Sequence, residues 1–385
     1  MEKPLRVLAV DVGTGTQDIL LFESDRAVEN CLQLIMPSPT VIVAEQIRRA
    51  SQSGAPVVLT GRTMGGGPSA WAARDHALAG HPTFATPDAA RTLDDDLSAV
   101  EALGITIIDD AEIPALARRY GDTLARVRMR DFDAAAIRAA FTSFAVAPAV
   151  DVIAVAAFDH GAAPPGYSDR RFRFDYIERA VRARPEPTAF AYEANAIPAD
   201  LTRLAAVARD AAEYQPDTET PRLFVMDTGA AAVAGALEDQ TVISREECLI
   251  ANIGNFHTLA FHLRGGRILS LFEHHTGELT QPQLEGYLRD LAAGTLENER
   301  VFAESGHGAL RLVEPGARAT DDALPFLAVT GPRRELLRGS TLHPYEAVPH
   351  GDMMLAGCFG LLRGVEALAP ELAPAIDATL GPRGW

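Results

Sequence analysis

The chain has 385 residues, 47% hydrophobic and 23% charged, with a formal net charge of −17 at pH 7. This length suffices for two domains with their own cores. The negative charge disfavours binding to nucleic acid or to anionic membrane surfaces. The first residues do not read as a signal peptide, and no apolar stretch reaches the roughly 18–20 residues that span a bilayer. We expect a cytoplasmic protein that binds neither nucleic acid nor membrane.

Lysine and cysteine usage excludes several classes of enzyme. Lys3 is the only lysine, so the chain has neither a GxxxxGK[ST] phosphate loop nor a plausible Schiff-base lysine. The three cysteines, Cys31, Cys248 and Cys358, are far apart in the sequence. No CxxC or CxxxCxxC spacing occurs, which argues against iron–sulfur clusters and cysteine-only zinc sites.

The opening stretch LRVLAVDVGTGTQDILLF (5–22) has two interpretations. A buried strand followed by Gly13 and Gly15 is typical of a dinucleotide-binding loop, which a helix would follow. However, the third glycine of GxGxxG is replaced by Asp18, and the apolar run 19–22 is bounded by turn residues. Such a run favours a second strand. We therefore predict a β-hairpin with a turn rich in Gly and Thr.

Apolar runs typical of strands recur along the chain. Each is followed by glycine, by acidic residues or by an alanine-rich segment typical of a helix, and this alternation predicts an α/β fold with a mostly parallel sheet. These segments are 55–80, 103–122, 150–161, 188–214 and 221–240. The segment 214–222 is expected to be a polar, exposed linker.

The segment CLIANIGNFHTLAFHLRGGRILSLFEHHTG (248–277) repeats the pattern of the opening stretch. An apolar strand, a glycine-containing turn and another strand follow one another, and 252–255 falls where 11–14 fell. A third strand is expected after the RGG turn. Two such units indicate two similar halves.

These features resemble the superfamily of actin, sugar kinases and heat-shock chaperones, in which a β-hairpin from each domain holds the phosphates of ATP. The resemblance implies a two-domain α/β fold, actin-like and ribonuclease H-like, with the ATP cleft between the domains. Domain I would span 1–228, with a crossing helix and tail at 351–385 returning to it, and domain II would span 229–350. More narrowly, DVGTGTQDILLF, MGGGP, NIGNFHT and PHGDMM resemble a prokaryotic family often labelled pyruvate formate-lyase activating proteins. Because the chain has no three-cysteine motif, we do not expect radical iron–sulfur chemistry.

The resemblance also implies cofactors and roles. ATP and Mg²⁺ would be bound, with Asp11 as the catalytic residue that holds the metal through its water shell. Glycine turns let backbone N–H groups approach phosphate oxygens, and a glycine beside adenosine lets the nucleoside lie against the backbone. The residues assigned to the nucleotide are Gly13, Thr14, Gly15, Thr16, Asn252, Gly254, Asn255, Thr330 and Gly331.

Further candidates come from domain I and from the wall of domain II. Asp159 or His160 would act as a general base, and Arg170, Arg171 or Arg173 would clamp an anion. The alternative for this loop is a solvated segment with local salt bridges. Gly65 to Gly67 precede a predicted helix N-terminus, which favours anions, although a flexible loop fits equally well. Weaker candidates are Glu193 and Asn195 at another strand end, and Glu273, His274 and His275, which would be surface residues in the alternative interpretation.

The leading functional expectation is an ATP-dependent kinase acting on a small acceptor. Asn252 stands where many members of the superfamily have a carboxylate, and the chaperones' catalytic lysine has no counterpart. A slow ATPase or nucleotide-gated switch acting on a protein partner is therefore a second hypothesis. A member that no longer uses ATP is a third.

Overall fold

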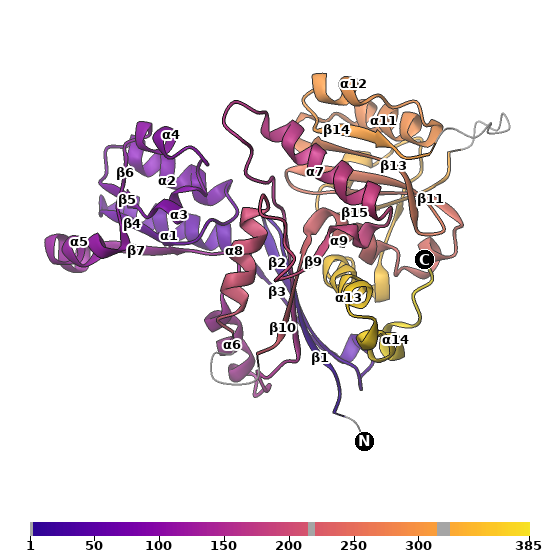
Figure 1. Cartoon of the computed structure of the whole chain (residues 1–385), viewed down its shortest axis with the longest axis horizontal. Helices are drawn as coiled ribbons and strands as arrows, with labels where there is room; N and C mark the ends of the chain where they lie inside the picture. Colours follow the sequence, from indigo (N-terminus) through magenta and orange to yellow (C-terminus); the bar gives the residue numbers. More distant parts are fainter. Residues whose placement is uncertain (1–2, 215–219, 314–323) are drawn as a thin grey trace.

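The computed structural model describes residues 3–214, 220–313 and 324–385. Its elements form three sheets, which Figure 1 shows as a central sheet, a domain in orange to its upper right, and a smaller lobe in purple to its left. The predicted α/β class is thus confirmed. We call the three parts the central domain, the second domain and the side lobe.

The central sheet has the order β3-β2-β1-β8-β10-β9. β1 pairs antiparallel with β2, so the opening stretch is a hairpin and the dinucleotide-binding alternative is excluded. β1, β8 and β10 run parallel and are almost wholly buried and apolar, as expected for strands covered on both faces. The strands are β1 (Arg6–Val12), β2 (Thr16–Glu23), β3 (Leu32–Pro37), β8 (Val152–Ala157), β9 (Ala191–Glu193) and β10 (Arg222–Asp227).

The second domain repeats this arrangement with the order β14-β13-β12-β11-β15-β16. Strands β11 and β12 form an antiparallel hairpin, and β13 follows as the predicted third strand. Strand β15 lies parallel beside β11. The internal repeat seen in the sequence is therefore a structural repeat. The strands are β11 (Glu247–Ile253), β12 (His257–Arg264), β13 (Arg267–His275), β14 (Gly308–Arg311), β15 (Phe326–Thr330) and β16 (Tyr345–Glu346).

The side lobe has a parallel sheet of its own, with the order β6-β5-β4-β7, and a separate hydrophobic core. It is inserted between β3 and β8. Sequence patterns identified its strand–helix units but not their separation from the central sheet, which is mixed rather than mostly parallel. The lobe comprises β4 (Val57–Gly61), β5 (Thr83–Ala85), β6 (Ile105–Ile107), β7 (Ala125–Met129), α1 (Pro39–Ser53), α2 (Pro68–Leu78), α3 (Pro87–Ala90), α4 (Leu97–Ala102) and α5 (Ile113–Tyr120).

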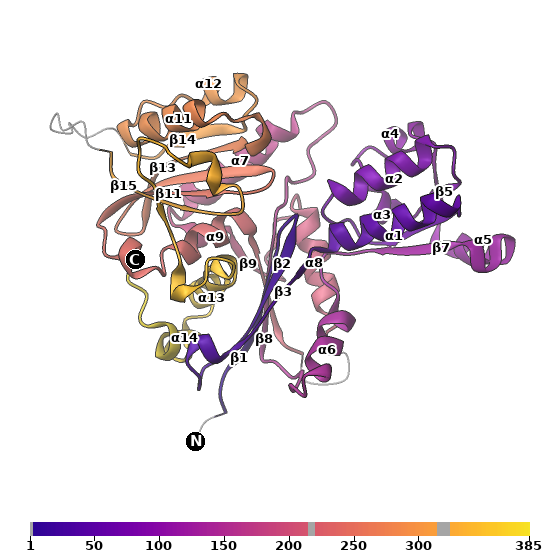
Figure 2. The same cartoon turned by 180° about the vertical axis from the view of Figure 1, so that it is seen from behind.

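Two helices rich in small residues, α9 (Thr228–Ala236) and α13 (Ala356–Leu368), cross between the central and second domains (Figure 2). A Cβ atom on Gly235 would lie 1.7 Å from the carbonyl oxygen of Ala356, and one on Gly360 would lie 1.9 Å from that of Ala231. The two backbones are therefore in direct contact. The crossing helix expected within 351–385 is present as α13, whereas the predicted domain boundaries at 228 and 350 stay a prediction.

The remaining helices are α6 (Ala134–Ser143), α7 (Asp169–Ala183), α8 (Thr202–Ala211), α10 (Gln240–Ile243), α11 (Gln281–Ala293), α12 (Asn298–Ala303) and α14 (Ala373–Leu380). Of these helices, α8 packs against β8 and β10, α11 against β12 and β13, and α7 and α12 against β14. In the parts of the chain that the structure describes, no helix combines the length and apolar character needed to cross a bilayer. Of the predicted linker 214–222, residues 215–219 lie outside the described residues, and Tyr214 and Pro221 beside them are buried rather than exposed.

Candidate functional site

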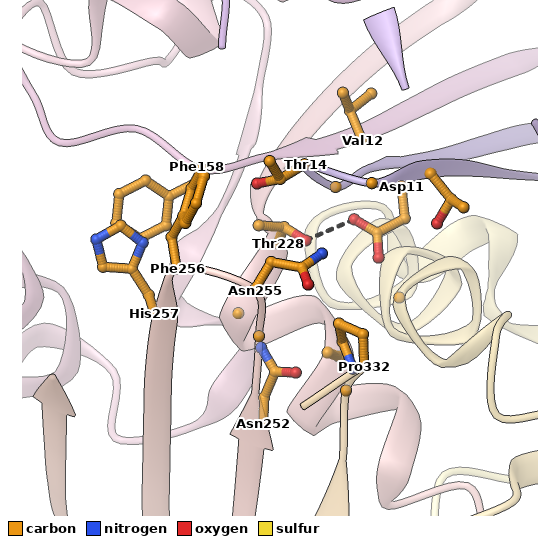
Figure 3. A pocket seen from close by; sticks show the side chains of 18 of the residues that line it. Asp11, Val12, Thr14, Phe158, Thr228, Asn252, Asn255, Phe256, His257 and Pro332 are labelled. Atoms are coloured by element: carbon orange, nitrogen blue, oxygen red, sulfur yellow. Dashed lines mark hydrogen bonds between the residues drawn. The ribbon is translucent and has the colours of Figure 1, made fainter. Parts of the chain in front are cut away.

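A cavity of about 400 Å³ lies where the three parts meet. Both glycine turns, the loop before α2, the segment after β8 and the start of α13 line it (Figure 3). Most of the predicted site residues line this one cavity, although their roles stay predictions. They are Asp11, Gly13, Thr14, Gly15, Thr16, His160, Asn252, Gly254, Asn255, Thr330 and Gly331.

The two hairpin turns have matching geometry. The Gly13 amide donates to the carbonyl of Thr16 at 3.0 Å, and the Gly254 amide donates to that of His257 at 2.9 Å. The tips approach closely, because a Cβ atom on Gly15 would lie 3.3 Å from Asn255 Nδ2. The turns thus bring backbone from both domains to one end of the cavity.

Two buried carboxylates lie beside these turns. Asp11 and Asp18 are directly opposite each other on β1 and β2, and each is 8% exposed. The Thr228 hydroxyl donates to Asp11 Oδ1 at 2.6 Å (Figure 3), whereas Asp18 Oδ1 has no hydrogen-bond partner among the described residues. Burial raises the pKa of both carboxyl groups to about 7, and the repulsion between them adds to the shift of Asp18. Asp18 was not among the predicted site residues, although the register of the predicted hairpin places it opposite Asp11.

These carboxyl groups predict a pH dependence of stability in metal-free protein. Because their folded-state pKa is raised from 3.8 to about 7, they stabilise the fold fully below the lower value and lose that contribution as pH rises through the upper one. The loss is about 1.4 kcal/mol per pH unit for each extra proton that the folded state holds. In urea unfolding with chelator, Asp18→Asn should therefore gain stability relative to wild type between about pH 5 and about pH 8. If the difference in unfolding free energy between Asp18→Asn and wild type stayed the same across this pH range, the raised pKa of Asp18 would be contradicted.

The glycine loop before α2 closes the cavity from the side lobe. Gly67 caps α2 with φ +63°, and a Cβ atom there would lie 2.8 Å from the ring of Phe256. Phe256 follows the second turn and also meets Trp71 edge to face at 5.7 Å. The Gly65 amide donates to Asp131, whose carboxylate is held by Arg203 through two nitrogens at 2.7 and 3.0 Å. The loop is thus held in a defined conformation rather than free.

Asp159 does not have the position that a general base requires. Its two carboxylate oxygens accept the amides of Gly161 and Leu204, each at 2.8 Å, and it is 3% exposed and not among the residues lining the cavity. Its contacts hold the β8–α7 loop and α8 together. This corrects the prediction that Asp159 faces the cleft, whereas His160 does line it.

The three arginines of the same segment also point elsewhere. Arg170 donates to the carbonyls of Phe302 and Gly306, and Arg171 pairs with Glu299 at the surface. Arg173 is fully buried between the two domains. The predicted anion clamp is therefore wrong for these residues, and Arg203, which sequence analysis did not select, lines the cavity instead.

Arg173 lies at the centre of a buried ion network. It contacts Asp227 at the end of β10 at 2.8 Å and holds Glu273 of β13 through two nitrogens at 2.8 and 3.1 Å. All three side chains are about 1% exposed. These contacts hold the pKa of Glu273 below its usual range, although its burial opposes them. Glu273 also lines the cavity, while Glu193 pairs with Arg222 away from it.

Four histidines gather near Glu273 at the deep end of the cleft. His257 stacks on Phe158 with ring centroids 3.9 Å apart (Figure 3), and its ring is 5.4 Å from that of His160. His275 and His307 lie 5.0 and 5.1 Å from His257. Burial lowers the pKa of His307 to about 3, and desolvation of the ring together with the charge of Arg173 lowers that of His160 to about 4, although part of the His160 residue is exposed. His274 points away, and its ring contacts the carbonyls of His275 and Glu304.

Comparison with protein families gives one match. The family described as "Putative pyruvate format-lyase activating enzyme (DUF1786)" matches residues 64–336. The chain belongs to this family. The matched DUF1786 region runs from the glycine loop before α2 to the segment after β15, and so includes most of the cavity's walls.

No curated protein matches this DUF1786 chain in a sequence search. The solved structures that align with this chain include three of similar length. They are the ethanolamine utilization protein EutJ from Carboxydothermus hydrogenoformans, a "putative N-acetylmannosamine kinase" from Listeria monocytogenes and the ROK hexokinase from Thermus thermophilus. Identities are 12%, 11% and 13%, and each alignment covers 94% of this chain. They cover 90%, 99% and 98% of the other chains, with TM-scores of 0.29, 0.31 and 0.29. Alignments at this level say nothing about activity.

Proposed function

We propose that this protein binds Mg-ATP in the cavity and transfers the terminal phosphoryl group to a small acceptor. The observation that carries the proposal is the meeting of two glycine hairpins, one from each domain, beside the buried carboxylates of Asp11 and Asp18. Backbone turns of this kind bind anions, and a carboxylate pair binds a hard cation. A nucleoside triphosphate with its metal supplies both charges.

The carboxylate pair fits Mg²⁺. Asp18 Oδ1 is buried without a hydrogen-bond partner in the described structure, and Asp11 has its Oδ2 within 1.8 Å of where a Cβ atom on Gly357 would lie. Oxygen ligands of this type, supplemented by water, suit the octahedral preference of the ion. Bound there, the ion would neutralise phosphate charge during transfer. Asp11 and Asp18 would hold it.

The opposite wall suits the nucleoside. Gly331 has φ +93°, and a Cβ atom on it would lie 2.5 Å from the carbonyl oxygen of Ile253 and 2.6 Å from Asn252 Oδ1. No side chain fits between β15 and the second turn, so a flat group can approach the backbone. Pro332, Met353 and Met354 provide apolar surface nearby. We assign the adenosine to this wall and the acceptor to the side of His160 and the glycine loop.

Asn252 favours a second candidate, a slow ATPase or nucleotide-gated switch. Its side chain lines the cavity beside the second turn (Figure 3), and an amide cannot accept a proton from an attacking water or acceptor. A switch would show partner binding that depends on the nucleotide, whereas a kinase would consume ATP much faster once the right acceptor is present. The activating-enzyme chemistry in the family description is not part of either proposal, because the cysteine spacing does not suit an iron–sulfur cluster.

Titration calorimetry with ATP and ADP, with and without Mg²⁺, tests the proposal. We expect micromolar binding that needs Mg²⁺ and that weakens about tenfold or more in Asp11→Asn, since a metal ligand is lost. Asp75→Asn on the exposed face of α2 is the matched control and should bind like wild type. If the wild-type protein bound no nucleotide, both candidate functions would be overturned. The remaining hypothesis would then be a protein of this fold that no longer uses ATP.

A further inference from the structure

We propose that His160, His257 and His307 form a binding site for a divalent transition metal, with Zn²⁺ as the first candidate. One nitrogen from each ring lies within 4.8 Å of the others, and the three residues come from separate segments of the chain. His160 follows β8, His257 begins β12, and His307 precedes β14. The site would therefore join the central domain to the second domain at the deep end of the cleft.

The unsatisfied nitrogens are the second observation that points to a ligand. His307 is 1% exposed, and neither of its ring nitrogens has a hydrogen-bond partner among the described residues. His257 Nε2 is likewise buried without a partner in that part of the chain. A buried polar atom that lacks a hydrogen bond lowers the stability of the fold by about 1–3 kcal/mol. A metal ion would satisfy them together.

The surroundings suit a cation despite two nearby arginines. The charge of Arg173 is matched by Asp227 and Glu273, and that of Arg203 is matched by Asp131. Glu273 Oε2 lies 3.8 Å from His307 Nδ1, beyond hydrogen-bond distance, and a small shift on metal binding would let this carboxylate orient the imidazole.

Three imidazoles favour a metal of intermediate softness over Mg²⁺ or Ca²⁺. With Zn–N distances of about 2.0–2.1 Å the nitrogens would be about 3.4 Å apart, so nitrogens now up to 4.8 Å apart must approach one another by up to about 1.4 Å on binding. Three protein ligands leave a fourth position for water or for an oxygen of a bound ligand. Because His160 and His257 line the cavity, that position lies within reach of its contents.

Equilibrium dialysis of the full chain against Zn²⁺, followed by metal analysis, tests the site. We expect one zinc per chain in wild type and in His343→Asn, an exposed histidine outside the cluster. His160→Asn should bind at least about 100-fold more weakly, since loss of an outer-shell partner alone costs 10–100-fold. Its side chain is exposed, so this variant keeps the test valid if His307→Asn fails to fold.

The same dialysis with Asp11→Asn separates this site from the proposed magnesium site. Zinc binding at wild-type level in Asp11→Asn, together with its loss in His160→Asn, would support three histidine ligands, and Co²⁺ in place of Zn²⁺ should give the intense visible absorption of a four-coordinate site. Equal zinc binding by wild type and His160→Asn, or no stoichiometric zinc in wild type, would overturn the proposal. Neither result depends on whether ATP binds.

Discussion

Replacing Arg173 with methionine is expected to lower the free energy of unfolding by about 3–5 kcal/mol, because it leaves two buried carboxylates without their cation. Asp227 and Glu273 are both about 1% exposed, and Arg173 is the cation that contacts each of them. Methionine fills much of the volume but supplies no charge. Burial raises the pKa of Asp227 even with the arginine present, so its carboxyl group is the first expected to take up a proton in the variant.

Urea unfolding of Arg173→Met measures this loss, and Arg182→Met on the same helix is its control. Arg182 pairs with Glu178 four residues earlier, with 56% and 40% of the side chains exposed. A surface pair of this type contributes about 0.3–0.5 kcal/mol. Similar unfolding midpoints for the two variants would show that the buried network does not stabilise the fold.

Gly235→Ala is the second substitution with a large expected effect. The added methyl group would lie 1.7 Å from the carbonyl oxygen of Ala356 and 2.5 Å from its carbonyl carbon, so helices α9 and α13 must separate. Overpacking of a core costs about 1–3 kcal/mol when side chains can adjust, and here the obstacle is backbone. We expect a loss at the upper end of this range or beyond it, measured by thermal and urea unfolding.

Gly286→Ala is the matched control for that substitution. Gly286 lies in helix α11, and a Cβ atom there meets nothing within 4 Å. Alanine is the better helix former by about 1 kcal/mol, so this variant should be as stable as wild type or more so. If Gly235→Ala behaved in the same way, the contact between the crossing helices would not be as close as the structure gives it.

The sequence predicted the elements that carry local patterns. Both hairpins could be recognised because an apolar run of four residues after a glycine turn is typical of a strand, and the repeat at 248–277 reinforced the first. The small-residue helix α13 was expected from the superfamily resemblance and not from a local pattern of this kind. The side lobe was not separated from the central sheet, because a βα unit has the same pattern whichever sheet it joins.

The site was only partly predictable. Residues in the turns, such as Gly13 and Gly254, follow from local sequence. Asp159 and His160 are adjacent, yet one caps backbone amides and the other faces the cavity, and only tertiary structure decides between these positions. His307 comes from a segment without any motif, so its meeting with His160 and His257 depends on the packing of two domains.

The Arg173 network has a consequence for how a ligand enters the cleft. Separating the central and second domains would expose Arg173 together with Glu273, at a cost of several kcal/mol. The side lobe, by contrast, touches the second domain through Phe256, which rests on Gly67 and Trp71 and is itself 37% exposed. Breaking that aromatic contact costs about 0.5–1.5 kcal/mol beyond the area it buries. Parting the side lobe from the second domain is therefore expected to cost less than separating the two larger domains, while Arg62 of the side lobe stays paired with the buried Asp210 of the central domain.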